Sequence, residues 1–193
     1  MRHRAGETVE YAITYLEMTA RPDVARPHMP SGPVSALVAA DTPPAWYFLS
    51  LYDAVGSEYE WTDRHQQSTE EIEAFLHHKD VTLFSLVRDG WPHGFFILDA
   101  REEGVVDLSY FGLVPQAIGR GVGQYLLSTA VHMAWDIPLT ERVTVNTCSL
   151  DHPRALPLYQ KVGFEPYRRE TVSRVLTRDR DLIDPPTQET QNV

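Results

Sequence analysis

The fold is decided by residues 105–135, whose sequence is VVDLSYFGLVPQAIGRGVGQYLLSTAVHMAW. Residues 105–114 are rich in β-branched and aromatic types and predict a strand. Pro115 must end this strand, because proline has no N–H to donate to a sheet ladder. Apolar residues then recur at helical spacing from Val122 to Trp135. The stretch therefore predicts a strand, a turn and a helix in succession.

The turn between this strand and this helix carries Gly119, Gly121 and Gly123 at alternate positions, with Arg120 among them. The N–H groups at a helix start have no intrahelical partner, and glycines leave them uncovered, which suits an anion. The spacing G-x-G-x-G differs from the dinucleotide pattern G-x-G-x-x-G, and no Lys-Ser or Lys-Thr completes a P-loop. The turn is either an anion site of another class or a tight turn whose glycines only permit close packing.

Composition narrows the class of protein. A chain of 193 residues suits one domain, and its net charge of −10 argues against a nucleic-acid partner. The single cysteine excludes an internal disulfide and is typical of a reducing compartment, so we expect a cytoplasmic protein. We find neither a signal-peptide h-region nor an apolar run long enough for a membrane. The scattered histidines predict no metal site.

The remaining segments surround the central stretch with further strands and helices. Signals include a capping box formed by Ser68 and Glu71 and a hairpin turn at Asp89-Gly90. Together they predict an α/β (α+β) fold, with a mixed, mostly antiparallel central sheet flanked by helices. We expect strands at 8–18, 34–39, 81–87, 93–99, 142–148 and 164–177, and helices at 44–55, 68–78 and 151–162. For the domain organisation, we expect an extra N-terminal strand with a proline-rich linker at 1–33, a main domain at 34–177 and a polar tail at 178–193.

A second informative segment is residues 146–164, NTCSLDHPRALPLYQKVGF. With residues 114–123, VPQAIGRGVG, it resembles the GCN5-related N-acetyltransferase (GNAT) family. That family reads roughly V-x-P-x-x-[QR]-G-x-G-x-G in its strand–turn–helix and N-x-x-A-x-x-L-Y-x-x-x-G-F later. The resemblance covers about residues 34–177. It implies a GNAT-like acyl-CoA N-acyltransferase fold and the transfer of an acetyl group from acetyl-CoA to an amine.

The resemblance also implies where acetyl-CoA binds. Its pyrophosphate would sit on backbone N–H groups of the turn, and its pantetheine would lie beside the central strand where that strand splays from the next parallel one. The chain departs from the family pattern at Ile118, where Gln or Arg is usual, and at His152, where Asn is frequent. The implied cofactor-binding residues are Phe111, Leu113, Val114, Ile118, Gly119, Arg120, Gly121, Val122, Gly123 and His152.

For catalysis, the resemblance places Tyr159 as the acid that protonates the leaving thiolate. The sequence does not fix the general base: Asp107 is one candidate, and Glu58, Glu60 and His65 are others. Asp107 is otherwise a carboxylate on the strand surface. The period of two in a strand puts Asp107 and Ser109 on one face. Cys148 is read as a small buried hydrophobe, since direct transfer needs no covalent intermediate.

The loop at 57–67 is dense in aromatic and ionisable groups and could line an acceptor pocket. Alternatively, it is a surface loop anchored by a tryptophan. We expect a small-molecule amine as acceptor, with a peptide or protein acceptor, or an acyl-CoA-binding module without turnover, as alternatives. The N-terminal strand could cover a sheet edge or pair with another protomer as a homodimer. The expected acceptor-binding residues are Tyr59, Trp61, His65 and Ser109.

Overall fold

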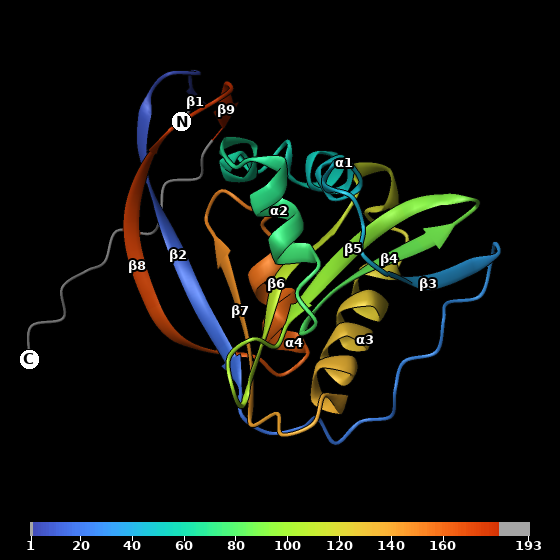
Figure 1. Ribbon diagram of the computed structural model, residues 1–193. Helices are drawn as coiled ribbons and strands as arrows, with labels where there is room; N and C mark the ends of the chain where they lie inside the picture. Colours follow the sequence, from blue (N-terminus) through green and yellow to red (C-terminus); the bar gives the residue numbers. More distant parts are fainter. Residues whose placement is uncertain (1, 182–193) are drawn as a thin grey trace, which may run out of the picture.

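The computed structural model describes residues 2–181 and contains a seven-stranded sheet in the order β3-β4-β5-β6-β7-β2-β8 (Figure 1). Only the pair β6–β7 is parallel. The predicted mixed, mostly antiparallel sheet with flanking helices is confirmed. The sheet strands are β2 (Thr8–Met18), β3 (Ser35–Ala40), β4 (Val81–Arg88), β5 (Trp91–Asp99), β6 (Val105–Leu113), β7 (Arg142–Cys148) and β8 (Glu165–Val175).

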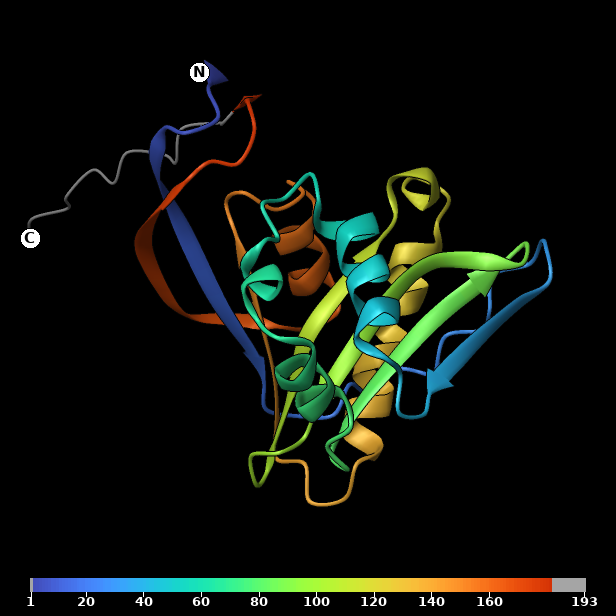
Figure 2. The ribbon, with the colours of Figure 1, turned by 45° about the horizontal axis from the view of Figure 1, so that its top comes forward.

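Four α-helices of the described part cover the two faces of this sheet, with α1 and α2 on one face and α3 on the other (Figure 2). The core lies between these layers. Phe48 of α1 contacts Phe95 of β5, whereas Leu126 and Leu127 of α3 are fully buried beneath the opposite face. The helices are α1 (Ala45–Gly56), α2 (Thr69–Leu76), α3 (Val122–Asp136) and α4 (Ala155–Lys161), with short 3₁₀ turns η1 (Asp63–Gln66) and η2 (Pro115–Ala117).

The N-terminal strand β2 has the bounds that its residues predict, but it does not cover the outer edge of the sheet. It lies between β7 and β8 and is antiparallel to both. Its backbone is thus paired on both sides within the chain from Ile13 to Glu17, whereas Thr8–Ala12 pair with β8 alone. The linker that follows is held against α3, because Arg21 and Arg26 both pair with Asp136.

The helix starts show where local signals decide the structure. The capping box of α2 is present: Ser68 Oγ accepts from the N–H of Glu71 at 3.2 Å, and Glu71 accepts from the N–H of Ser68 at 2.8 Å. The prediction that α4 begins at Asp151 is wrong, since that helix begins at Ala155. The Asp151 carboxylate instead accepts from Thr147 Oγ1 and the Cys148 N–H, both at 2.8 Å, and so closes the turn after β7.

The two ends of the described part, residues 2–3 and 180–181, pair beside the main sheet. β1 (Arg2–His3) pairs with β9 (Arg180–Asp181), so residues 178–181 of the predicted polar tail are held in place. The rest of that tail, 182–193, lies outside the described residues. Within residues 2–181, no helix is long and apolar enough to cross a membrane.

Candidate active site

The central feature of the site is a split between the two parallel strands. β6 and β7 are paired only from Val105–Arg142 to Asp107–Thr144, and beyond that point no pairing joins them. β6 continues along β5, while β7 continues along β2. Along the split, β6 therefore has backbone groups with no neighbouring strand. A slot of this kind can receive an extended ligand.

The backbone of β6 offers two residues to this slot. The Val114 N–H donates to the His93 carbonyl of β5 at 3.0 Å. N–H groups alternate in direction along a strand, so those of Phe111 and Leu113 point toward the split. The Val114 carbonyl also accepts from the Ala117 N–H at 2.9 Å. Both backbone groups of Val114 thus have partners within the protein, and the expected contact of Val114 with pantetheine stays a prediction.

The glycine turn ends the slot. Gly119 and Gly121 have φ angles of +81° and +74°, and a Cβ at either position would meet no atom within 4 Å. Gly121 is also the N-cap of α3, with no capping side chain. The first N–H groups of α3, beginning with Val122, therefore lack protein partners and face open space at the positive end of the helix. Arg120 is exposed within the turn and adds a positive charge.

Two residues of the turn have neighbours within the protein. A Cβ on Gly123 would lie 3.4 Å from Leu113 Cδ1, an ordinary van der Waals contact, so the packing of α3 on β6 does not require a glycine there. The Ile118 N–H donates to the Pro115 carbonyl at 3.2 Å. The expected role of Ile118 as a backbone donor to the pyrophosphate stays a prediction.

A β-bulge orients the polar residues of β6. Tyr110 is paired with Ile97 and Leu108 with Leu98, so Ser109 is an extra residue without a partner on β5. Strict alternation would put Asp107 on the same face as Phe111. The bulge instead puts Asp107 on the face covered by α2: its neighbour Asp99 bonds Arg101, whose guanidinium lies 5.1 Å from the ring centroid of Phe75 in α2.

Asp107 sits at the last paired position before the split. Its Oδ1 accepts from Thr144 Oγ1 at 2.6 Å, and its Oδ2 accepts from Ser109 Oγ at 2.8 Å. Burial raises the pKa of Asp107 above its ordinary value, although these two hydrogen bonds act in the opposite direction. A buried carboxylate with a raised pKa is a better proton acceptor than an ordinary surface one.

Tyr159 lies on the other face of the split. Its ring centroid is 6.1 Å from that of Phe111 and 5.9 Å from that of Phe164, and the residue is 5% exposed. Burial raises the pKa of Tyr159 well above its ordinary value, and the charges of Asp151 and Asp107 add to the effect. The hydroxyl is therefore protonated at neutral pH and can act as a proton donor.

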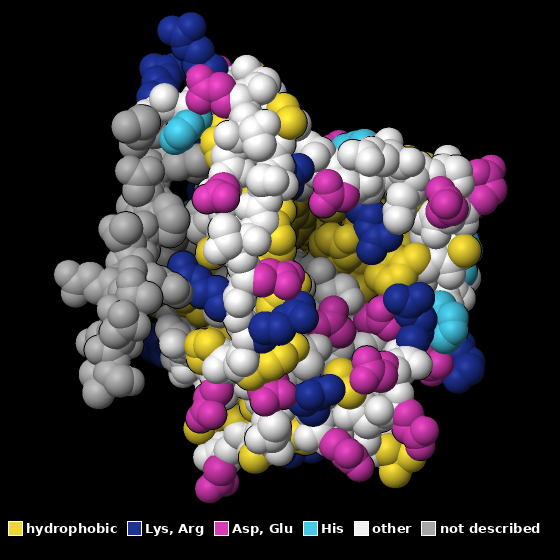
Figure 3. All heavy atoms as spheres, turned by 90° about the vertical axis from the view of Figure 1, so that its left-hand side faces the viewer, with side chains coloured by type: hydrophobic (Ala, Val, Ile, Leu, Met, Phe, Trp, Pro, Cys, Tyr) yellow, Lys and Arg dark blue, Asp and Glu magenta, His cyan; other side chains and the backbone are white. Residues whose placement is uncertain are grey.

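The face that carries Asp107 is hollowed. A cavity of about 390 Å³ is lined by Asp99, Arg101, Glu102, Val105, Asp107 and Thr144. Figure 3 views the molecule from the left-hand side of Figure 1 and shows a hollow with hydrophobic side chains at depth and charged side chains of both signs around it. Ser109 reaches this region through its hydrogen bond to Asp107. The cavity thus lies beside the proton acceptor.

The predicted acceptor residues of the loop at 57–67 are not among those that line this cavity. Trp61 packs against Tyr52 and Tyr110, with ring centroids 5.4 and 5.7 Å away, and a Cβ on Gly56 would lie 2.4 Å from it. Tyr59 is 6.2 Å from the ring of His152. These contacts make the aromatic residues a bridge between α1 and the turn that precedes α4.

Two of the other base candidates, His65 and Glu60, have structural partners. His65 is half exposed, and its Nε2 is 2.6 Å from Asp53 of α1. Glu60 is 1% exposed and accepts from the N–H and hydroxyl of Thr177, at 2.9 and 2.8 Å. Glu58 is exposed. His152 Nδ1 accepts from the Arg154 N–H at 3.1 Å at the start of α4. Asp107 is thus the base candidate that adjoins the split.

Residues that sequence reasoning missed complete this face. Arg64 Nε donates to the Tyr110 hydroxyl at 2.5 Å, and its guanidinium lies 4.8 Å from the ring centroid of Phe75. Thr144 holds Asp107 from the neighbouring strand. No local pattern marks these residues, because each acts through a contact with a distant segment. The presence of Arg64 in a loop dense in aromatic residues was the only available signal.

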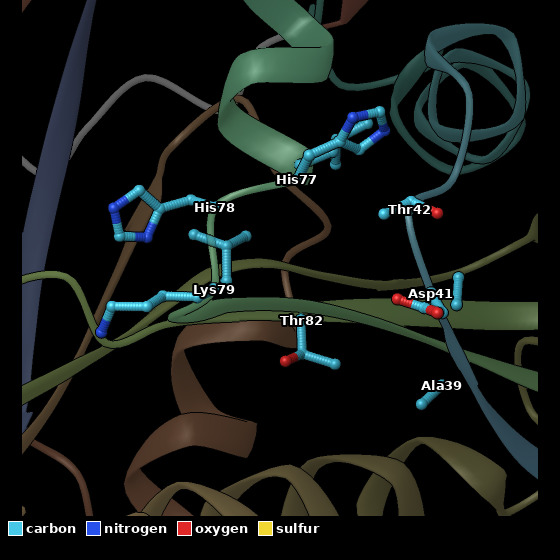
Figure 4. Close-up of a pocket in the computed structure, with 10 residues that line it drawn as sticks. Ala39, Asp41, Thr42, His77, His78, Lys79 and Thr82 are labelled. Carbon is cyan, nitrogen blue, oxygen red and sulfur yellow. The ribbon is translucent and has the colours of Figure 1, made fainter.

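Other reactive groups lie outside this arrangement. Burial raises the pKa of Cys148 to about 12, so its thiol is protonated at neutral pH and is a poor nucleophile. A separate cavity of about 290 Å³ lies between β3 and the end of α2 (Figure 4). There, His77 extends toward the segment of Thr42, whereas His78 and Lys79 extend the other way. Within the described range, no group of three or more His, Cys, Asp or Glu side chains is arranged to hold a metal.

Comparison with known proteins identifies a family match. The model of the acetyltransferase (GNAT) family matches residues 48–164, more than half of the chain. This span contains the glycine turn, the split and Tyr159. β2 and β8 lie outside it. No curated protein matches the sequence.

Solved structures share the fold at low sequence identity. A GCN5-related N-acetyltransferase from Kribbella flavida has a TM-score of 0.57 and 21% identity over 84% of this chain and 56% of that one. A tandem GNAT protein from the clavulanic acid biosynthesis pathway has a TM-score of 0.59 and 17% identity over 88% of this chain and 55% of that one. An aminoglycoside acetyltransferase from an uncultured soil metagenomic sample, in complex with sisomicin, has a TM-score of 0.54 and 12% identity over 67% of this chain and 87% of that one. The chain spans less than two thirds of the first two structures.

Proposed function

The chain belongs to the acetyltransferase (GNAT) family, and from this premise we propose that it transfers the acetyl group of acetyl-CoA directly to a primary amine of a small molecule. The observation that carries the proposal is the split between β6 and β7, with Asp107 on one of its faces and Tyr159 on the other. A donor that enters from one side and an amine that enters from the other would meet within the slot.

The residues around the slot fit acetyl-CoA. Gly119 and Gly121 leave open space above the uncapped start of α3, where pyrophosphate oxygens would accept backbone N–H groups. The backbone of Phe111 and Leu113 faces the split and would hold the pantetheine amides. Arg120 adds charge to the anion site. Acetyl-CoA supplies an activated acetyl group, and the protein supplies position and proton transfer.

The proton transfers follow from the two faces. An alkyl ammonium must lose a proton before its nitrogen can attack, and Asp107 would accept that proton directly or through a water. Tyr159 would donate a proton to the departing sulfur. The two proton transfers use different residues, because Asp107 would face the amine and Tyr159 would face the thioester sulfur. Cys148 has no part in the transfer, since its thiol is protonated.

A small acceptor is favoured by the size of the hollow beside Asp107, about 390 Å³. A pocket of this volume is in the usual range for small ligands. A protein N-terminus or a lysine would need an open groove instead. The aminoglycoside acetyltransferase that shares the fold was solved with sisomicin, a small amine-bearing ligand. Several acidic side chains on this face, among them Asp99 and Glu102, suit a cationic acceptor.

A thiol-release assay tests the proposed reaction. The protein is incubated with acetyl-CoA and a panel of small amines, peptides with free N-termini and lysine peptides, and free CoA thiol is measured. We expect release with small amines and mass-spectrometric detection of the N-acetyl product. Release with peptides alone would support a peptide acetyltransferase. Binding of CoA by calorimetry without release for any amine would support a binding module without turnover.

A further inference from the structure

The side chains of β2 that lie on the same sheet face as Asp107 form what we call the wall, and β2 is the strand next to β7. Leu16 and Met18 of β2 point into the core, where they are 0% and 5% exposed. Side chains alternate along a strand, so Tyr15 and Glu17 point to the opposite face. That face is the one that carries Asp107, because Glu17 is paired with Thr144, and Thr144 bonds Asp107.

Glu17, Thr144 and Asp107 therefore form one row across three adjacent strands. Neighbouring strands are about 4.8 Å apart, so the first and last positions of this row are separated by about 10 Å. Glu17 Oε2 pairs with Arg142 at 3.3 Å, and the Glu17 side chain is 26% exposed. The carboxylate is thus held in place and partly exposed on the face that carries Thr144, which lines the cavity.

The neighbouring row extends this wall. Tyr15 is paired with Asn146 on one side and donates its hydroxyl to Glu170 of β8. The Arg168 guanidinium lies 3.9 Å from the centroid of the Tyr15 ring. These side chains come from β2 and β8, which both lie outside the residues that match the family. The wall is thus a feature of this chain that the family match does not describe.

We propose that Glu17 is a specificity-determining residue that binds a second ammonium group of the acceptor while the reacting amine sits beside Asp107. The proposal rests on the proposed function and names its acceptor class: amines that carry a second cationic group about 10 Å away, two strand spacings. The net charge of −10 favours the approach of such polycations.

The test compares 1,7-diaminoheptane with heptylamine in the thiol-release assay at saturating acetyl-CoA. The two amines share a chain length and differ in the second ammonium. We expect the KM of the diamine to be at least about tenfold lower, as one charge-assisted contact would give. Glu17→Gln should raise the KM of the diamine to that of heptylamine while kcat and the KM of acetyl-CoA change less than about twofold.

Two further variants keep the test decisive. Glu10→Gln removes the same charge from the same strand. Glu10 is exposed, is paired with Ser173 and lies on the opposite face of β2 from Glu17, so this variant should keep the diamine preference. Arg142→Gln removes the partner that competes for Glu17 and should lower the KM of the diamine. This opposite change in KM keeps the proposal testable if Glu17→Gln fails to fold.

The outcomes separate this inference from the proposed function. A wild-type protein that acetylates both amines with equal KM overturns the inference and leaves the proposed function standing. A diamine preference that survives in folded Glu17→Gln overturns the assignment to Glu17. Absence of release with every amine overturns the proposed function and, with it, this inference.

Discussion

The two sides of the β6–β7 split are built in different ways. The side that we assign to acetyl-CoA consists of backbone groups in one continuous segment, from Phe111 to the start of α3. The side that we assign to the acceptor consists of side chains from β2, β6, β7 and the loop before α2, with Asp107 held by Thr144 and Tyr110 held by Arg64. A backbone site depends on local conformation, whereas a side-chain site depends on how distant segments meet.

Breaking the backbone side should have the largest effect. Gly121→Glu should weaken acetyl-CoA binding by more than about 100-fold, or about 2.8 kcal/mol, measured by calorimetry. The φ of +74° strains any residue with a Cβ, and a carboxylate would lie where the phosphates are expected.

The matched control is Gly90→Glu. Gly90 has a φ of +82° and open space around it, but it lies in the β4–β5 hairpin turn. Strain and added charge are therefore similar in the two variants, and only position differs. Gly90→Glu should bind acetyl-CoA normally. Normal binding by Gly121→Glu would refute the placement of the pyrophosphate.

Breaking the side-chain half should act on the rate. Asp107→Asn should lower kcat/KM for the amine by about 10³-fold, within the range for loss of a general base. A base must be deprotonated, so wild-type activity should fall as the pH falls through the pKa of Asp107. Burial raises that pKa, so this acidic limb should lie at higher pH than for an ordinary carboxylate.

Asp99 provides the control for this prediction. It is paired with Asp107 across β5 and β6 and lines the same cavity. Burial acts to raise the pKa of Asp99, but hydrogen bonds from Arg101 lower it overall. Asp99→Asn should therefore retain the acidic limb that Asp107→Asn loses. An unchanged limb in Asp107→Asn would exclude Asp107 as the base.

A change at Tyr159 should affect turnover without affecting acetyl-CoA binding. Tyr159→Phe should lower kcat by about 100-fold, because the departing sulfur loses its proton donor, with acetyl-CoA affinity changed less than about twofold. The control is Tyr47→Phe. Tyr47 lies on α1 and its hydroxyl is hydrogen-bonded to Ser85 at 2.9 Å, so its loss should leave kcat unchanged. Equal kcat for wild type and Tyr159→Phe would remove this tyrosine from the mechanism.

The smallest expected effect is on acetyl-CoA affinity and concerns the side chain at position 118, on the backbone side of the split. Ile118 occupies the position where the family pattern has Gln or Arg. Ile118→Arg should tighten acetyl-CoA binding by about threefold at low salt, and the gain should shrink as salt screens the added charge. Ile118→Glu should weaken binding to a similar degree. Salt-independent affinity in both variants would show that this side chain lies away from the phosphates.

Local signals predicted most of the fold correctly. β2 and β7 have the predicted bounds, and the capping box places the start of α2. The start of α4 was predicted wrongly, since Asp151 suits an N-cap by type but bonds Thr147 and Cys148 instead. The partners of the Val114 and Ile118 N–H groups within the protein, on β5 and in η2, also became known only from the structure.

The sequence by itself determined the glycine turn, the order of the elements and the family resemblance, because each of these depends on residues that are near one another in the chain. Only the tertiary structure decided which face Asp107 occupies, since a single extra residue at Ser109 reverses the alternation of β6. Only the structure placed β2 between β7 and β8 and Glu17 in the row of Asp107. The pairing of β2 with β7 joins residues 125 or more positions apart, and no local pattern in this chain encodes it.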